Sequence, residues 1–103
     1  GITGKLGIDF ARLKEVNPRL IYCSSTGFGN RGEERLRPGY DPVFQALGGV
    51  AQMNAYFCGH EALASVSVAD YQAAMLVVTG VTAALFHRER TGDGQLVETS
   101  LLQ

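Results

Sequence analysis

Cysteine, histidine and tryptophan are scarce in this chain of 103 residues, which has two cysteines, two histidines and no tryptophan. Cys23 and Cys58 are not in a C-x-x-C spacing, and neither His60 nor His87 has acidic or cysteine neighbours at ligand spacing. The sequence therefore predicts no metal site. We interpret both cysteines as reduced thiols of a cytoplasmic protein, since no signal-peptide pattern precedes them.

A strong net charge is also missing, because nine Lys and Arg side chains nearly balance ten Asp and Glu side chains. Such a chain has no field of one sign that would attract nucleic acid or an anionic membrane. The longest apolar run, residues 71–86, has about 16 residues and is interrupted by Thr79, Gly80 and Thr82, whereas a membrane span needs roughly 20. We therefore expect no nucleic-acid or membrane partner, and a small-molecule ligand held by a local cluster.

The glycines do not form a known phosphate-binding loop. Neither Gly27-x-Gly29 nor Gly92-x-Gly94 matches the G-x-G-x-x-G or G-x-x-x-x-G-K pattern, so turns are the simpler interpretation. A serine nucleophile is not indicated either, because the chain has no G-x-S-x-G elbow.

What the sequence does contain is an alternation of helix and strand signals typical of an α/β protein. Asp9 is a suitable N-cap, Asp41 followed by Pro42 is the usual start of a helix, and Gly92 is suited to a helix end. Residues 51–61 show no clear period and are expected to form a loop. The predicted elements are a helix at 10–16, a buried, central, parallel strand at 20–25, a helix at 42–47, one long buried helix at about 70–90, and a strand at 96–100.

The loop after the first predicted strand, residues 27–39, carries several charges at a position where open α/β sheets bind ligands. Arg31, Arg35 and Arg37 present paired donors that suit a phosphate or a carboxylate. Glu33 and Glu34 could instead pair with these arginines locally. Both interpretations stay open at this point.

Asp70 lies where an extended segment meets the long apolar helix, so the helix N-terminus would stabilise its negative charge. A plain N-cap aspartate explains this position. A nucleophile or general base needs the same placement, because a held carboxylate aimed at a cleft can react. Helix physics alone does not separate the two roles.

Several ordered motifs together resemble one known family, the class III CoA-transferases, also called the CaiB/BaiF family. The motifs, which span nearly the whole chain, are Asn17-Pro18-Arg19-Leu20-Ile21-Tyr22, Gly27-Phe28-Gly29, Arg37-Pro38-Gly39-Tyr40-Asp41, Gln45-Ala46 with Gly48-Gly49, Ala69-Asp70-Tyr71, and Arg90-Thr91-Gly92-x-Gly94-Gln95. The resemblance implies an α/β fold with part of a Rossmann-like parallel sheet, in a protein that forms homodimers.

The resemblance also implies roles for five residues. Asp70 matches the catalytic aspartate, which passes CoA from an acyl-CoA to a carboxylic acid through aspartyl anhydride and aspartyl-CoA thioester intermediates. Tyr40 and Asp41 match a pair that lines the substrate site, and Lys5 and Arg37 match basic contacts to CoA. Coenzyme A is then a substrate, and no metal is involved.

Two alternatives to CoA transfer stay open. Related acyl-CoA racemases have a proton-shuttling histidine where this chain has Tyr40, and a phenol with a pKa near 10 is a poor base at neutral pH. The other alternative is a non-catalytic fragment. We expect residues 1–103 to be part of the family's large domain without an internal boundary, inactive alone, and prone to self-associate through exposed apolar surface.

Overall fold

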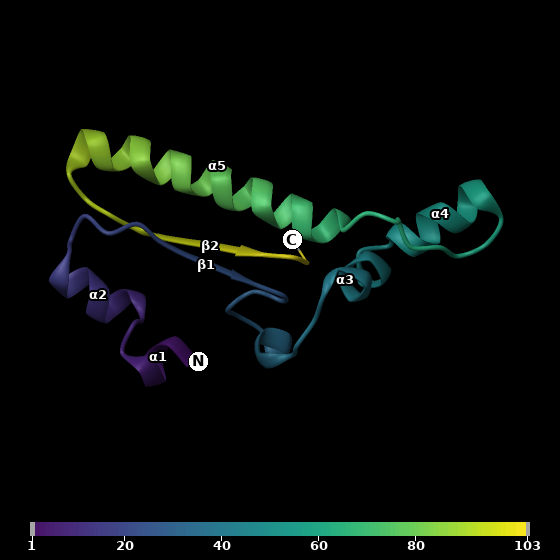
Figure 1. The fold of residues 1–103 in the computed structure, drawn as a ribbon, viewed down its shortest axis with the longest axis horizontal. Helices are drawn as coiled ribbons and strands as arrows, with labels where there is room; N and C mark the ends of the chain where they lie inside the picture. Colours follow the sequence, from purple (N-terminus) through teal and green to yellow (C-terminus); the bar gives the residue numbers. More distant parts are fainter. Residues whose placement is uncertain (1, 103) are drawn as a thin grey trace.

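The computed structural model describes residues 2–102 and has an elongated shape of 54 × 31 × 20 Å (Figure 1). A self-contained domain of this length has a radius of gyration of about 13 Å, whereas the value for this chain is 16.9 Å. The chain therefore does not close around one core. Its elements are α1 (Ile2–Leu6), α2 (Phe10–Val16), β1 (Tyr22–Thr26), the 3-10 helix η1 (Glu33–Leu36), α3 (Asp41–Leu47), α4 (Val50–Cys58), α5 (Val68–Thr91) and β2 (Leu96–Ser100).

Strands β1 and β2 form a parallel pair in which Tyr22 lies opposite Leu96. Helix α5 precedes β2 and packs along the strands (Figure 1). Gly80 permits this approach, because a Cβ there would lie 2.6 Å from Cγ1 of Val97. The predicted α/β class with parallel strands and one long helix is confirmed. The expected burial of the first strand is wrong for the described residues, since the side chains of β1 alternate between half-buried and exposed.

Helix α5 begins two residues earlier than predicted, with Ser67 as its N-cap, so that Asp70 is its third residue. Its C-terminal end is as predicted. Gly92 has the left-handed conformation, with φ of 86°, and its N–H donates to the carbonyl of Arg88. A residue with a side chain is strained in that conformation, which is why glycine is favoured there.

The long helix is buried along one side only. Its buried residues are Ala69, Ala73 and Ala84, and these small side chains let the backbone approach its neighbours. The apolar side chains on the rest of its surface are exposed: Tyr71, Met75, Val78, Leu85 and Phe86. The prediction of an all-round buried helix is therefore wrong for the described residues, and the predicted exposed apolar surface is confirmed.

By length and composition alone, α5 is able to cross a membrane. It has 24 residues, and its most apolar window has a mean hydropathy of 1.4, whereas the sequence suggested an apolar run too short for a span. This is weak evidence for a membrane segment, because the central helix of a water-soluble protein meets the same criterion.

Residues 51–61 were expected to form a loop, and this expectation is wrong for residues 51–58 and correct for residues 59–61. Helix α4 occupies Val50–Cys58, bounded by Gly49 and Gly59, which both have positive φ. None of the residues of α4 is buried in the described chain. A helix that buries no face needs no one-sided apolar pattern, so periodicity could not reveal it.

Candidate functional site

The carboxylate of Asp41 caps the start of α5 rather than its own helix. Asp41 was predicted to be the N-cap of α3, but it is the first residue of that helix and Tyr40 is the N-cap, without a side-chain cap bond. Oδ2 of Asp41 accepts a hydrogen bond of 3.0 Å from the backbone N–H of Asp70, which is 29 residues away. Only 4% of Asp41 is exposed. The free N–H groups of the first turn of α5 are thus satisfied by a side chain from α3.

The environment of Asp41 keeps it ionised. Burial acts to raise the pKa of this carboxyl, but hydrogen bonds from the Gln45 side chain and from the backbone N–H groups of Asp70 and Ala69 outweigh burial. They hold the pKa of Asp41 below its ordinary value of 3.8. An anion therefore lies at the N-terminus of α5, where the helix dipole favours it.

Gln45 joins this carboxylate to the segment that leads into α5. Its side chain lies one helical turn after Asp41, is 2% exposed, and donates from Nε2 to Oδ1 of Asp41. The same nitrogen donates to the carbonyl of Val66 at 3.1 Å, and Oε1 accepts from the N–H of Ala64 at 2.7 Å. One buried amide thus holds both the cap of α5 and the chain that precedes it.

Asp70 has its backbone held and its side chain open to solvent. It is exposed, and no hydrogen bond or ion pair involves its carboxylate within residues 2–102. It lines an open hollow of about 500 Å³ together with the residues that lead into α5 and the first turns of that helix: Ser65, Val66, Ser67, Tyr71 and Ala74. A carboxylate in this setting is accessible to a ligand as large as a thioester group.

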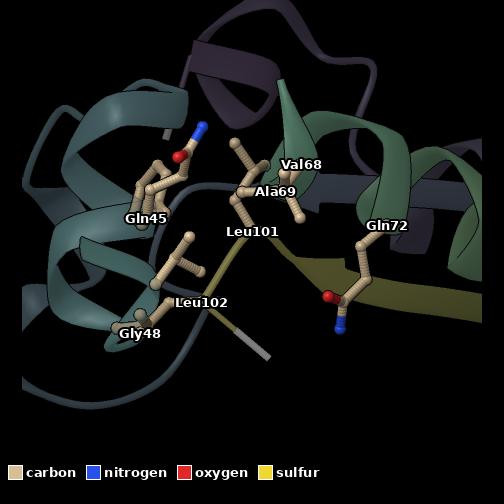
Figure 2. A pocket seen from close by; sticks show the side chains of 9 residues that line it. Gln45, Gly48, Val68, Ala69, Gln72, Leu101 and Leu102 are labelled. Carbon is tan, nitrogen blue, oxygen red and sulfur yellow. The ribbon is translucent and has the colours of Figure 1, made fainter. Parts of the chain in front are cut away.

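A second, smaller hollow of about 260 Å³ lies between α3, the start of α5 and the turn after β2 (Figure 2). Figure 2 shows Leu101 and Leu102 between the two helices, with Gln45 on the α3 side and Gln72 on the α5 side. The remaining lining residues are Phe44, Gly48, Val50, Val68 and Ala69. The two hollows therefore flank the first turn of α5.

The predicted site residues are only partly brought together. Tyr40 is adjacent to Asp41 in the chain and is 68% exposed. Arg37 pairs with Glu34 at 3.1 Å and lies over the ring of Phe28, as the local-pairing interpretation of this loop requires. Lys5 is exposed on α1 and makes no hydrogen bond or ion pair within the described residues. Helix α1 and the start of α5 lie on opposite sides of the strands in Figure 1.

Gln45 belongs to one of the motifs of the family resemblance, which implies no role for it. Its spacing was an available signal, because residues four apart on a helix are neighbours and Gln45 follows Asp41 by four. What the spacing could not indicate was the third participant, the segment Ala64–Val66. Within residues 2–102, no group of three or more His, Cys, Asp or Glu side chains is placed to hold a metal ion.

Comparisons with protein families, with curated proteins and with solved structures all indicate the same family. The family described as "CoA-transferase family III" matches residues 1–103. Two relatives are a succinate–glutarate CoA-transferase from Agrobacterium fabrum, 39% identical over 95% of this chain and 24% of its own length, and an acetyl-CoA:oxalate CoA-transferase from Acetobacter aceti, 34% identical over 98% of this chain and 26% of its own. The chain thus spans about a quarter of the length of these curated relatives.

Among solved structures, a CaiB/BaiF family protein from Brucella suis superposes with a TM-score of 0.89 at 36% identity. The match covers 99% of this chain and 27% of that protein. The arrangement of helices and strands described above is therefore shared with an experimentally determined relative.

Proposed function

The chain belongs to CoA-transferase family III, and we propose that the complete protein moves CoA from an acyl-CoA thioester to a free carboxylic acid, with Asp70 as the nucleophile. The relatives named above are both CoA-transferases, one named for succinate and glutarate and the other for acetyl-CoA and oxalate. These names support the reaction class and leave the donor and acceptor of this protein open.

One observation carries the proposal. The carboxylate of Asp70 is exposed and unpaired in the described chain, while the backbone N–H of the same residue is anchored to buried Asp41 at 3.0 Å. A nucleophile needs both properties, because its reacting atom must be accessible and its position must be constrained.

The reaction proceeds in four exchanges that balance without an oxidant or a metal. The Asp70 carboxylate attacks the thioester carbonyl, and the CoA thiolate leaves as a mixed anhydride forms. The thiolate then attacks the aspartyl carbonyl, which releases the donor acid and leaves an aspartyl-CoA thioester. The acceptor carboxylate attacks this thioester and expels the thiolate again. Finally the thiolate attacks the acceptor carbonyl of the second anhydride, which forms the new acyl-CoA and restores Asp70.

For the other site residues we propose supporting roles, which the family resemblance implies. We place Lys5 and Arg37 against CoA, since cations bind its phosphate groups, and the exposed ring of Tyr40 beside the substrate. Asp41 is buried under the first turn of α5, and we assign it to holding that turn.

We also propose that this chain is part of a larger domain of a cytoplasmic homodimer. Two observations support a larger assembly: the elongated shape, with a radius of gyration of 16.9 Å, and the exposed apolar side chains along α5. Apolar surface of this extent is normally covered by other parts of a protein or by a partner.

The test is to trap the aspartyl-CoA thioester on the complete protein. The protein is incubated with acetyl-CoA or succinyl-CoA and digested, and the peptide containing Asp70 is examined by mass spectrometry for a CoA adduct. We expect the adduct in the wild type and none in Asp70→Asn. Asp93→Asn, which removes an exposed aspartate near the other end of α5, should retain it. An adduct of undiminished yield in Asp70→Asn would contradict the assigned nucleophile.

The same protein samples test the racemase alternative. Incubation with a 2-methylacyl-CoA in deuterium oxide, without any acceptor acid, should give no exchange at the α-carbon if CoA transfer is the function. Rapid incorporation of deuterium without a CoA adduct on Asp70 would favour racemisation instead.

A further inference from the structure

The orientation of the Gln45 side-chain amide is determined by its neighbours. The carboxylate of Asp41 and the carbonyl of Val66 can only accept hydrogen bonds, so the NH₂ group must face them. The backbone N–H of Ala64 can only donate, so Oε1 must face it. The carbonyl of Ala64 is a longer contact of the same nitrogen, at 3.4 Å. No other side chain of this size offers two donors and one acceptor in this arrangement.

The hydrogen bonds of Gln45 constrain the position of Asp70 by two routes. On one side, Gln45 orients the Asp41 carboxylate, which holds the N–H of Asp70. On the other, it fixes residues 64–66, which lead directly into the N-cap, Ser67. Because Ser67 makes no side-chain cap bond, the start of α5 depends on the contacts through Asp41 and Gln45.

We propose that Gln45 is a positioning residue for the nucleophile: it sets the direction in which the Asp70 carboxylate leaves the first turn of α5. This inference rests on the proposed function, since it assigns a role in the same reaction. Gln45 is buried at 2% exposure and does not line the hollow that Asp70 lines, so its effect passes through Asp41 and the segment 64–66. Small errors in the position of a nucleophile lower the rate steeply.

Asn54 provides a matched control for the cost of losing a structural amide. Its Nδ2 donates to the carbonyl of Ala62 at 2.8 Å, so it also ties a helix side chain to the segment before α5. It has no bond to Asp41 or to the first turn of α5. Asn54→Leu should therefore lower stability without changing the chemistry at Asp70.

The experiment compares Gln45→Leu, Gln45→Glu and Asn54→Leu in the complete protein. Each variant is mixed with acetyl-CoA and quenched at successive times, and the rate of CoA adduct formation on Asp70 is measured at several substrate concentrations. Gln45→Glu keeps the size and the oxygen that faces Ala64, but it offers at most one O–H donor, on a proton shared with the Asp41 carboxylate, so the bonds to Asp41 and Val66 are not both kept.

We expect both Gln45 variants to lower the maximal rate by about 10²-fold, with the acetyl-CoA concentration at half-maximal rate nearly unchanged. Asn54→Leu should keep the wild-type rate. If Gln45→Leu does not fold, Gln45→Glu alone decides the outcome. A wild-type rate in a folded Gln45 variant, or an equal loss in Asn54→Leu, would overturn the positioning role while leaving the proposed function intact. Absence of the adduct in the wild type would overturn both.

Discussion

The two ends of α5 are held in different ways. At the C-terminal end, the cap is local: Gly92 takes the left-handed conformation, its N–H donates to the carbonyl of Arg88 at 2.8 Å, and Arg88 and Arg90 place positive charge near the negative end of the helix dipole. Arg19 adds contacts from far along the chain, because its side chain donates to the carbonyl of Gly92 at 3.3 Å and its own carbonyl accepts from Arg88 at 3.4 Å. At the N-terminal end, the local candidate Ser67 makes no side-chain cap bond, and the cap comes from Asp41 on another helix.

This difference coincides with the location of the proposed chemistry. Asp70 lies at the end whose cap comes from a distant residue, and it is the end where α3, the segment 64–66 and α5 meet. A cap formed by neighbouring residues satisfies the free backbone groups at the helix end, but it does not orient the helix relative to other elements. A cap supplied by another element also fixes the direction of the first turn. The position of a nucleophile in that turn is then fixed as well.

The largest effect should come from removing the distant cap. Asp41→Leu leaves the N–H of Asp70 without its acceptor and removes the anion from the N-terminus of α5. We expect adduct formation on Asp70 to fall by about 10²-fold. Hydrogen exchange should become faster at the Asp70 amide and unchanged at Gly92. Equal acceleration at both ends would show that the two ends are not held independently.

Acid should have the next largest effect, through the carboxylate that caps the N-terminal end. Because the folded-state pKa of Asp41 lies below the ordinary value of 3.8, its contribution to stability is fully present above that value. The contribution is lost as the pH falls through the lower folded-state pKa. In the Asp70→Asn background, the NMR signal of the amide at position 70 should titrate below pH 3.8.

Asp41→Asn serves as the control, because it should abolish this titration. A midpoint at or above the ordinary value would contradict the hydrogen-bonded state of Asp41.

A smaller effect is expected at the C-terminal end of α5, which has the local cap. Gly92→Ala places a side chain in the left-handed conformation, with φ of 86°, at a cost of about 1–2 kcal/mol. The last turn of α5 should exchange its amide hydrogens faster, while the rate of adduct formation on Asp70 stays at the wild-type value. A loss of rate similar to that of Asp41→Leu would mean that the C-terminal end also positions the nucleophile.

The smallest effect should come from the N-cap of α5 itself. Replacing a serine N-cap by alanine commonly costs about 1 kcal/mol, but Ser67→Ala should change the free energy of unfolding by less than about 0.5 kcal/mol because its side chain makes no cap bond. Asp9→Ala is the comparison, since the Asp9 side chain accepts from the N–H of Arg12 at 3.2 Å. Urea unfolding of the two variants should show the larger change for Asp9→Ala.

Features set by local contacts were the ones that sequence reasoning recovered. The helix after Asp9, the end of α5 at Gly92 and the strand at residues 96–100 each have signals within a few residues, and all three are present. Helix α4 was missed because it buries no side chain in the described chain and so shows no apolar period. The burial of α5 was overestimated because composition reports how apolar a helix is, and not which of its sides is covered.

Sequence reasoning was enough to identify the family, the order of α2, β1, α3, α5 and β2, and Asp70 as the candidate nucleophile, because ordered motifs and helix signals are properties of neighbouring residues. It took the packing of distant segments to place Asp41 as the cap of α5 instead of α3, and to tie this cap to residues 64–66 through Gln45. The physical reason is that a buried carboxylate or amide must satisfy its hydrogen bonds with whatever groups packing brings near. Here those groups lie 19 to 29 residues away along the chain.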